Sequence, residues 1–309
     1  MHPNTLNSNS ALLARRSYLT GLAIALTGAI LFSTKAIVAK LIYRYNVDAV
    51  TLIFFRMAFS LPIFAGIALW QMHKAGSLSS KDRLSLVVLG LIGYYLSSFL
   101  DFLGLQYITA GLERLILFLT PSFVLLISAF FLKRAVSRLE WAALVVSYMG
   151  IVLVFFHDLK FGGSNVLLGS VLVLGAAVSY ALYLIQSGQL VQRLGSLRLV
   201  SYAMCVSSAA CIGQFFVLRP ASMLVQPLHV YSLSVVNAIF CTVLPVFMTM
   251  IAVKKIGAAT ASQAGMIGPV STLFLGAYFL DEPITSWQMA GTVLVMGGMY
   301  LLSAKKTSA

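Results

Sequence analysis

Along most of the chain, apolar residues follow one another in long runs that are separated by short polar segments. Each run, as a helix, is long enough to cross a bilayer core of about 30 Å. The runs lack the alternation of membrane-spanning strands, so they are predicted to be helices. The pattern predicts an all-α integral membrane protein with ten transmembrane helices, at residues 18–42, 49–70, 84–105, 109–132, 139–156, 166–186, 199–218, 232–253, 257–280 and 286–303.

The composition agrees with this prediction. Hydrophobic residues make up 60% of the 309 positions, charged residues make up 9%, and the mean hydropathy is +0.95. A soluble domain is about 45–50% apolar and about 25% charged, so an ordinary soluble protein is excluded. Cys205, Cys211 and Cys241 all lie in apolar runs. They are interpreted as packing residues and not as a disulfide framework.

The basic residues between the runs predict an orientation. If both termini are cytoplasmic, fourteen Lys and Arg residues lie on the cytoplasmic side and four on the opposite side, namely Lys40, Arg44, Lys160 and Arg219. Cytoplasmic loops of membrane proteins carry such an excess of Lys and Arg. Residues 1–17 and 304–309 are therefore predicted to be cytoplasmic tails of a multi-pass protein of a bacterial-type inner membrane.

The net charge of +13 does not indicate a nucleic-acid partner. The basic residues are dispersed in short clusters among the apolar runs, as in a membrane protein with many spans. The N-terminal segment is not predicted to be a signal peptide, because the apolar run that follows it is longer than a signal-peptide core.

The sequence repeats itself at an offset of 148 residues. The matches that carry most weight are those of glycine and proline: Gly21 with Gly169, Pro121 with Pro269, and Gly150 with Gly298. The offset predicts two repeats, residues 18–156 and 166–303, with five helices each. Because five is odd, the second repeat enters the membrane in the opposite direction, and the repeats are inverted.

Inverted repeats are typical of secondary transporters, whose substrates bind near the middle of the membrane at the repeat interface. The alternative is a duplication that was kept only for the stability of the fold. An enzyme is not indicated, because the sequence has no phosphate-binding loop, no serine elbow and no spacing of metal ligands. We therefore expect no cofactor and no metal.

Two segments in equivalent positions carry a family resemblance. The stretches LTPSFVLLISAFFL (119–132) and IGPVSTLFLGAYFLDEPIT (267–285) resemble the paired EamA domains of the drug/metabolite transporter superfamily. The second matches closely through Asp281-Glu282-Pro283, whereas the first has Lys133-Arg134 where an acidic residue is usual. The resemblance implies a carrier of ten helices with a central cavity. Members of the superfamily move amino acids, nucleosides and other small metabolites, so the substrate does not transfer with the fold.

Five ionisable residues lie inside predicted spans: Lys35, Arg56, Asp101, Glu113 and Arg114. All five belong to the first repeat, and counting along the helices places all of them in the outer half of the membrane. Such residues are costly in a membrane and usually face a cavity or a partner. Two interpretations of Asp101 and Glu113 are open: one of them binds substrate or protons, or they form a purely structural ion pair. Arg56 is interpreted as a structural partner.

Polar residues at helical spacing extend the candidate cavity. Tyr94, Ser98 and Asp101 share one helix face, as do Tyr180 and Tyr183. The candidate substrate-binding residues are Lys35, Tyr94, Ser98, Asp101, Glu113, Arg114, Tyr180, Tyr183, Asn237 and Gln263. Pro121 and Pro269 remove helix hydrogen bonds and are predicted to be hinges beside the cavity.

The sequence thus predicts a secondary transporter, with export favoured, for a small polar or zwitterionic metabolite such as an amino acid. An ammonium group would meet Asp101 or Glu113, and a carboxylate would meet Lys35 or Arg114. Protons are a candidate coupling ion, and facilitated diffusion is the alternative. Export of larger amphipathic or lipid-linked compounds remains open, as does, in a different class, a membrane sensor or enzyme.

Overall fold

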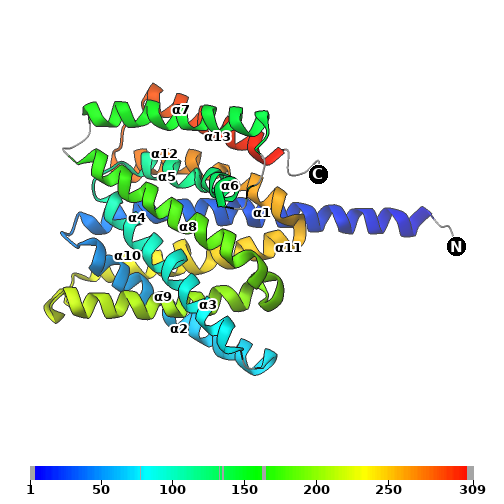
Figure 1. Cartoon of the computed structure of the whole chain (residues 1–309), viewed down its shortest axis with the longest axis horizontal. Helices are drawn as coiled ribbons and strands as arrows, with labels where there is room; N and C mark the ends of the chain where they lie inside the picture. Colours follow the sequence, from blue (N-terminus) through cyan, green and yellow to red (C-terminus); the bar gives the residue numbers. More distant parts are fainter. Residues whose placement is uncertain (1–3, 77, 132, 134–135, 162–164, 305–309) are drawn as a thin grey trace.

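A computed structural model of the chain describes residues 4–76, 78–131, 133, 136–161 and 165–304. All regular elements in these residues are helices, and no strand occurs among them. The helices form one bundle, from which the N-terminal part of the first helix extends (Figure 1). This architecture confirms the predicted all-α membrane fold.

The helices of the first predicted repeat include one π-helix, η1. They are α1 (Asn4–Tyr43), α2 (Ala49–Ala75), α3 (Ser80–Gly90), η1 (Leu91–Leu96), α4 (Ser97–Leu105), α5 (Ala110–Phe118), α6 (Thr120–Phe131) and α7 (Arg138–Phe161). The helices of the second repeat include a 3-10 helix, η2, and a second π-helix, η3. They are α8 (Val166–Leu194), α9 (Ser196–Leu218), η2 (Ala221–Leu224), α10 (Leu228–Ala238), η3 (Ile239–Val243), α11 (Leu244–Ala264), α12 (Ile267–Leu280) and α13 (Ser286–Ala304).

The predicted spans agree with these helices in order, and in number when the interrupted helices are joined and α11 is divided at its kink at Gly257. Eight segments of the described residues are long and apolar enough to cross a membrane, and Ile267–Leu280 is a shorter apolar helix. The last predicted span, 286–303, falls on α13, which packs along α7 (Figure 1). The differences lie at the ends of the helices and at interruptions within them.

The predicted span 109–132 is interrupted at Leu119, between α5 and α6. Pro121 has no backbone N–H, so it leaves the carbonyl of Leu117 without its usual helical donor. The Thr120 hydroxyl donates to that carbonyl over 2.7 Å, and the Ser122 hydroxyl donates to the carbonyl of Leu119 over 2.7 Å. The hydroxyl groups of Thr120 and Ser122 therefore supply hydrogen-bond donors to backbone carbonyls at the interruption.

The interruptions recur at the offset of the sequence repeat. The π-helix η1 begins at Leu91, and η3 begins 148 residues later at Ile239. At the same offset, the break at Leu119 lies within two residues of the counterpart of the break at 265–266 between α11 and α12. The two repeats therefore share the irregularities of their helices as well as the helices themselves. π-Helical segments are rare and are frequent at functional sites.

The contact between α7 and α13 follows the same offset. A Cβ atom added to Gly150 would lie 2.6 Å from the carbonyl oxygen of Gly291. A Cβ added to Gly298 would lie 2.6 Å from the carbonyl oxygen of Ala143. Gly298 is the counterpart of Gly150, and Gly291 is the counterpart of Ala143. Small residues let membrane helices approach closely, and here they join the fifth helix of each repeat.

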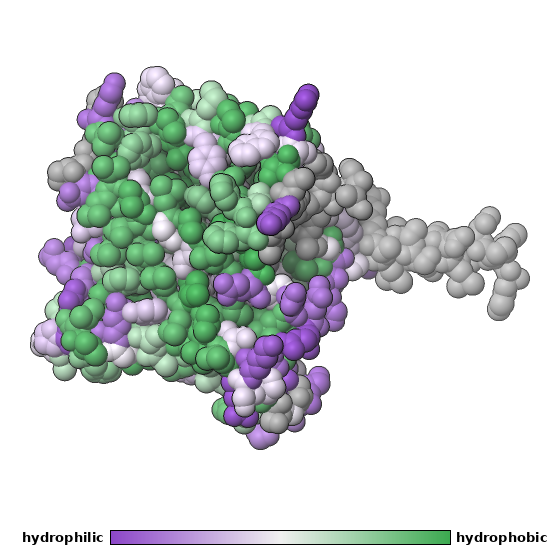
Figure 2. Space-filling model, viewed as in Figure 1, coloured by the Kyte–Doolittle hydropathy of each residue, from purple (hydrophilic) through white to green (hydrophobic). Residues whose placement is uncertain are grey.

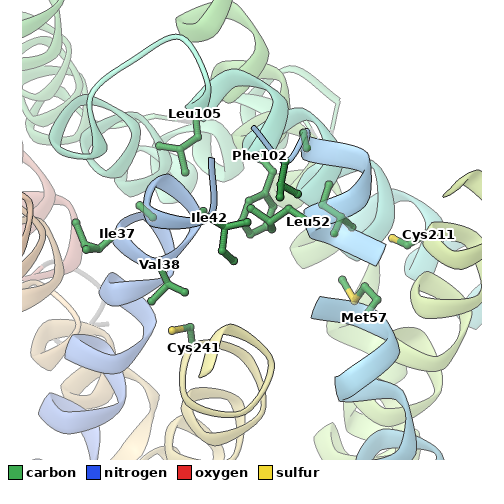
Figure 3. Close-up of a cluster of buried hydrophobic side chains, with 14 of the residues drawn as sticks. Ile37, Val38, Ile42, Leu52, Met57, Phe102, Leu105, Cys211 and Cys241 are labelled. Carbon is green, nitrogen blue, oxygen red and sulfur yellow. The ribbon is translucent and has the colours of Figure 1, made fainter. Parts of the chain in front are cut away.

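Apolar side chains cover most of one face of the bundle, with hydrophilic residues toward its left and right margins (Figure 2). Inside, a core cluster joins the two repeats, and Figure 3 shows its labelled members from α1, α2, α4, α9 and η3: Ile37, Val38, Ile42, Leu52, Met57, Phe102, Leu105, Cys211 and Cys241. All three cysteines are free thiols. Apolar packing between the repeats therefore surrounds the site described next.

Candidate functional site

A buried ion cluster joins three helices of the first repeat. The Lys35 ammonium group on α1 contacts the carboxylate of Asp101 on α4 and lies 3.1 Å from Oε1 of Glu113 on α5. The three side chains are 6%, 5% and 0% exposed, respectively. Counting along the helices predicted that these residues lie in the outer half of the membrane, and the structure brings Asp101 and Glu113 together through Lys35.

Two aromatic rings separate the cations of this region. The Phe102 ring centroid lies 5.0 Å from Cζ of Arg56 and 5.4 Å from Nζ of Lys35. The Phe32 ring centroid lies 5.5 Å from Nζ of Lys35 and 4.9 Å from Cζ of Arg114. Cations over the faces of aromatic rings are attracted by the ring quadrupole, most strongly where water is excluded. The rings therefore help to hold three positive charges in one buried region.

In the described part of the chain, the two arginines are not paired with carboxylates. Nε of Arg56 donates to the Thr242 hydroxyl over 2.8 Å, and its Nη1 donates to the Ser98 hydroxyl over 3.4 Å. Nε of Arg114 is buried and has no hydrogen-bond partner among the described residues. Within that part of the chain, neither guanidinium group has a carboxylate at ion-pair distance.

A cavity of about 200 Å³ lies beside the cluster. Its lining comes from both repeats and consists of Phe32, Lys35, Arg56, Gly93, Tyr94, Ser97, Ser98, Asp101, Arg114, Leu117, Phe118, Thr120, Tyr180, Met204, Thr242 and Val246. Six of the residues proposed from the sequence are among them: Lys35, Tyr94, Ser98, Asp101, Arg114 and Tyr180.

Four residues proposed from the sequence do not line this cavity. Glu113 is fully buried behind Lys35. The Tyr183 hydroxyl lies 3.2 Å from that of Tyr94, so Tyr183 supports the wall from behind. Asn237 is fully buried, and neither of its amide atoms has a hydrogen-bond partner among the described residues. Gln263 is half-buried near the end of α11.

Several lining residues were not predicted from the sequence to line the cavity. The most notable is Arg56, which was interpreted as a structural partner. The repeat offset could have found others, because lining residues form pairs at 148 positions: Phe32 with Tyr180, Arg56 with Met204, Tyr94 with Thr242, and Ser98 with Val246. Tyr94 lies in η1 and Thr242 in η3. The cavity therefore lies at the repeat interface and is flanked by the two π-helices.

The predicted hinges lie next to the helix breaks. Pro121 follows the interruption at Leu119 by two residues, and Pro269 follows the start of α12 at Ile267 by two residues. Thr120, beside Pro121, lines the cavity. Movement at either proline stays a prediction.

The end of the bundle at which α1 terminates holds a second set of contacts between the repeats. The Lys40 ammonium group lies 3.0 Å from Oε1 of Glu282. Both carboxylate oxygens of Glu282 accept the backbone N–H of Ala110 over 3.1 Å. We call Lys40, Ala110 and Glu282 the latch. It ties α1 and α5, which carry Lys35 and Arg114, to the turn after α12.

Comparison with known proteins agrees with this geometry. The sequence profile described as the EamA-like transporter family matches residues 19–156 and 167–304, in two copies. The chain belongs to the EamA-like transporter family. This membership agrees with the resemblance found in the two proline-containing segments. It makes the chain a transporter-family protein with two EamA domains.

Relatives cover most of the chain. The uncharacterized transporter YcbK of Bacillus subtilis is 29% identical over 93% of this chain and 92% of its own length. An uncharacterized transporter of Archaeoglobus fulgidus is 27% identical over 73% of this chain and 79% of its own. A solved crystal structure matches 94% of this chain and 99% of its own with a TM-score of 0.62 at 17% identity, which shows the fold alone. Together with the apolar helices, these relatives support a multi-pass membrane transporter.

Proposed function

We propose that this chain is a secondary transporter that moves one small polar metabolite per cycle by alternating access between its two repeats. The observation that carries the proposal is the cavity at the repeat interface, with buried charged residues in its wall. Transporters with inverted repeats bind their substrates at this interface. A zwitterion such as an amino acid is suited to the site, because cationic and anionic side chains both line it.

The size of the cavity favours a small substrate. Its volume of about 200 Å³ lies below the range of about 300–1,000 Å³ that is typical of sites for drug-sized ligands. A larger amphipathic or lipid-linked compound would need more space than this cavity offers, and it would leave the buried charged residues of the wall without a partner in the substrate.

We further propose that the latched end faces the outside of a bacterial-type inner membrane and that the termini are cytoplasmic. The excess of Lys and Arg on the opposite side supports this orientation. The latch then closes the outer side, and a carrier in that state loads its substrate from the cytoplasm. Export is accordingly the proposed direction.

Proton coupling is the proposed driving force, with Asp101 or Glu113 as the proton carrier. Both carboxylates contact Lys35 and are shielded from water, so protonation of either would change the charge balance of the cluster. Ionisable groups at membrane depth commonly form proton relays in transporters.

The function is tested with purified protein in liposomes that are loaded with a mixture of labelled amino acids and small organic acids. We expect efflux that depends on the protein and is lost in Asp101→Asn and Glu113→Gln at temperatures below the thermal midpoint of each variant, where the variants remain folded. Lack of efflux for every compound would argue against transport of small metabolites. Efflux that is unchanged in both variants would remove the carboxylates from the mechanism. An imposed pH gradient tests the coupling.

A further inference from the structure

Building on the proposed transport function, we propose that the carboxylate of the substrate is bound by Arg56 and Arg114, and that the substrate ammonium group is dispensable. The site then selects small organic anions with an apolar or aromatic body. Amino acids carry the same carboxylate and are bound through it, but they are not the preferred class. The argument rests on the unequal partners of the three cations in the cavity wall.

Lys35 is already neutralised within the protein. Its ammonium group lies between the carboxylates of Asp101 and Glu113, which come from two different helices. Breaking a buried ion pair leaves an uncompensated charge and costs about 3–5 kcal/mol. Lys35 is therefore a poor anchor for a substrate carboxylate, contrary to the role that the sequence suggested for it.

Arg56 and Arg114 are in a different position. Both line the cavity, both are buried, and the protein partners of Arg56 are hydroxyl groups. Nε of Arg114 has no hydrogen-bond partner among the described residues. A guanidinium group presents several donors in a planar fork that matches a carboxylate in charge and geometry. The two arginines thus offer unused donors to an anion.

The charge balance points the same way. Three cations face two carboxylates in this region, so one positive charge remains when all five groups are ionised. An uncompensated charge at membrane depth is costly. A bound monoanion cancels the excess charge, whereas a bound zwitterion leaves it in place.

The rest of the wall suits an apolar body. Phe32, Tyr94, Phe118 and Tyr180 contribute aromatic rings to the cavity. Asp101 also lines it, and its Oδ1 has no hydrogen-bond partner among the described residues. An ammonium group can therefore be accepted there, but one carboxylate oxygen contributes less to recognition than two guanidinium groups.

The test compares an amino acid with the acid that lacks its ammonium group and with the amine that lacks its carboxylate. The aliphatic set is leucine, isocaproate and isopentylamine, and the aromatic set is phenylalanine, hydrocinnamate and phenethylamine. Binding to the full-length protein in detergent is measured by calorimetry and by the shift of the thermal midpoint. We expect isocaproate or hydrocinnamate to bind at least as tightly as the matching amino acid, and the amines to bind at least about tenfold more weakly. Binding of the amines in preference to the acids, or no binding of either acid, overturns the proposal.

Variants then assign the binding to the arginines. Arg56→Met introduces the residue that the second repeat carries at the equivalent position, Met204, so the substitution suits the space. Arg114→Lys keeps the charge but loses the fork. Each is expected to weaken carboxylate binding about tenfold or more. Arg193→Met is the matched control, because Arg193 pairs with Asp82 on the surface and is 63% exposed.

The outcomes separate this inference from the proposed function. Carboxylate binding that is lost in both cavity variants but retained in Arg193→Met supports the inference, even if liposomes show no transport. Transport of amines alone would support the proposed function and overturn the inference. Carboxylate binding that survives in both cavity variants with unchanged affinity also overturns it.

Discussion

Glu282 of the second repeat accepts the backbone N–H of Ala110, the first residue of helix α5 in the first repeat. A carboxylate at a helix N-terminus satisfies a donor that the helix cannot use and interacts favourably with the helix dipole. One turn further along α5 lie Glu113 and Arg114. The end of the bundle and the candidate site are thus joined by one short helix.

This relationship predicts the effect of Glu282→Gln. The variant loses the charge at the helix N-terminus and the ion pair with Lys40, each worth up to about 1 kcal/mol. We expect the latched state to lose about 1–2 kcal/mol, a change of about 5–30-fold in its population relative to the open state. The measurement is the rate at which a thiol reagent labels Ser98→Cys from the latched side, in a protein whose native cysteines are replaced by alanine.

The neighbouring Asp281→Asn is the control for this prediction. The Asp281 side chain is 90% exposed and lies 3.8 Å from Arg44, so its removal should leave the labelling rate unchanged. Equal rates in Glu282→Gln and in the parent would show that the latch does not hold the end closed.

Gly268→Ala is expected to disturb Arg114 without unfolding the protein. A Cβ at this position would lie 2.6 Å from Nη2 of Arg114 and 3.1 Å from the Ser33 hydroxyl, so the guanidinium group must move. We expect carboxylate binding to weaken about tenfold, as measured by calorimetry. Gly297→Ala is the control, because a Cβ there meets no atom within 4 Å. Equal affinity in both variants would contradict the assigned position of Arg114.

Lys35→Met is expected to destabilise the protein strongly, by about 3–5 kcal/mol, because it leaves two buried carboxylates without their cation. Adding Asp101→Asn to Lys35→Met should recover part of the loss, since it removes one of the two charges. Thermal and chemical denaturation in detergent provide the measurement. If Lys35→Met is as stable as the parent, the ion cluster is not a structural necessity.

Asp48 predicts a pH-dependent contribution outside the membrane. Burial raises the pKa of Asp48, but hydrogen bonds from Thr51 and the contact with Arg219 outweigh it and hold the pKa below its ordinary value. The contribution is therefore present above the ordinary pKa of about 3.9 and is lost as the pH falls through the lower folded value. Asp48→Asn keeps a residue suited to the N-cap of α2 and loses the ion pair. We expect the variant to be less stable at neutral pH and the difference to vanish in strong acid. A pH-independent difference would contradict this.

The spans were predictable because each is an apolar run of at least 18 residues, a length typical of a transmembrane helix. The interruptions were not, because a π-helix and a break leave little trace in composition: the run 109–132 conceals the break at Leu119, and only Pro121 hints at it. The inverted repeat followed from the offset of 148, and the equivalent positions of η1 and η3 agree with it.

The site was predictable as a set of charges but not as a set of partners. Counting along the helices was enough to place Asp101 and Glu113 in the same half of the membrane, since each residue adds about 1.5 Å to a helix. When a helix is almost uniformly apolar, its sequence does not show which of its faces lines a cavity. Arg56 was therefore interpreted as a structural partner although it lines the cavity, whereas Asn237 was assigned to the cavity although it is fully buried and not among the lining residues.

The latch has no counterpart in the other repeat. At the offset of 148, Lys40 falls on Gly188 and Glu282 on Arg134, so the same ion pair cannot form at the opposite end. A carrier with two identical halves would populate its inward-open and outward-open states equally. This chain forms the Lys40–Glu282 ion pair at one end alone, whereas the opposite end has a different pair, Arg193 with Asp82, which is more exposed. The Lys40–Glu282 pair favours the state in which the latched end is closed, and the substrate or the coupling ion must offset this preference in every transport cycle. The differences between Lys40 and Gly188 and between Glu282 and Arg134 thus favour one resting state in a nearly symmetric transporter.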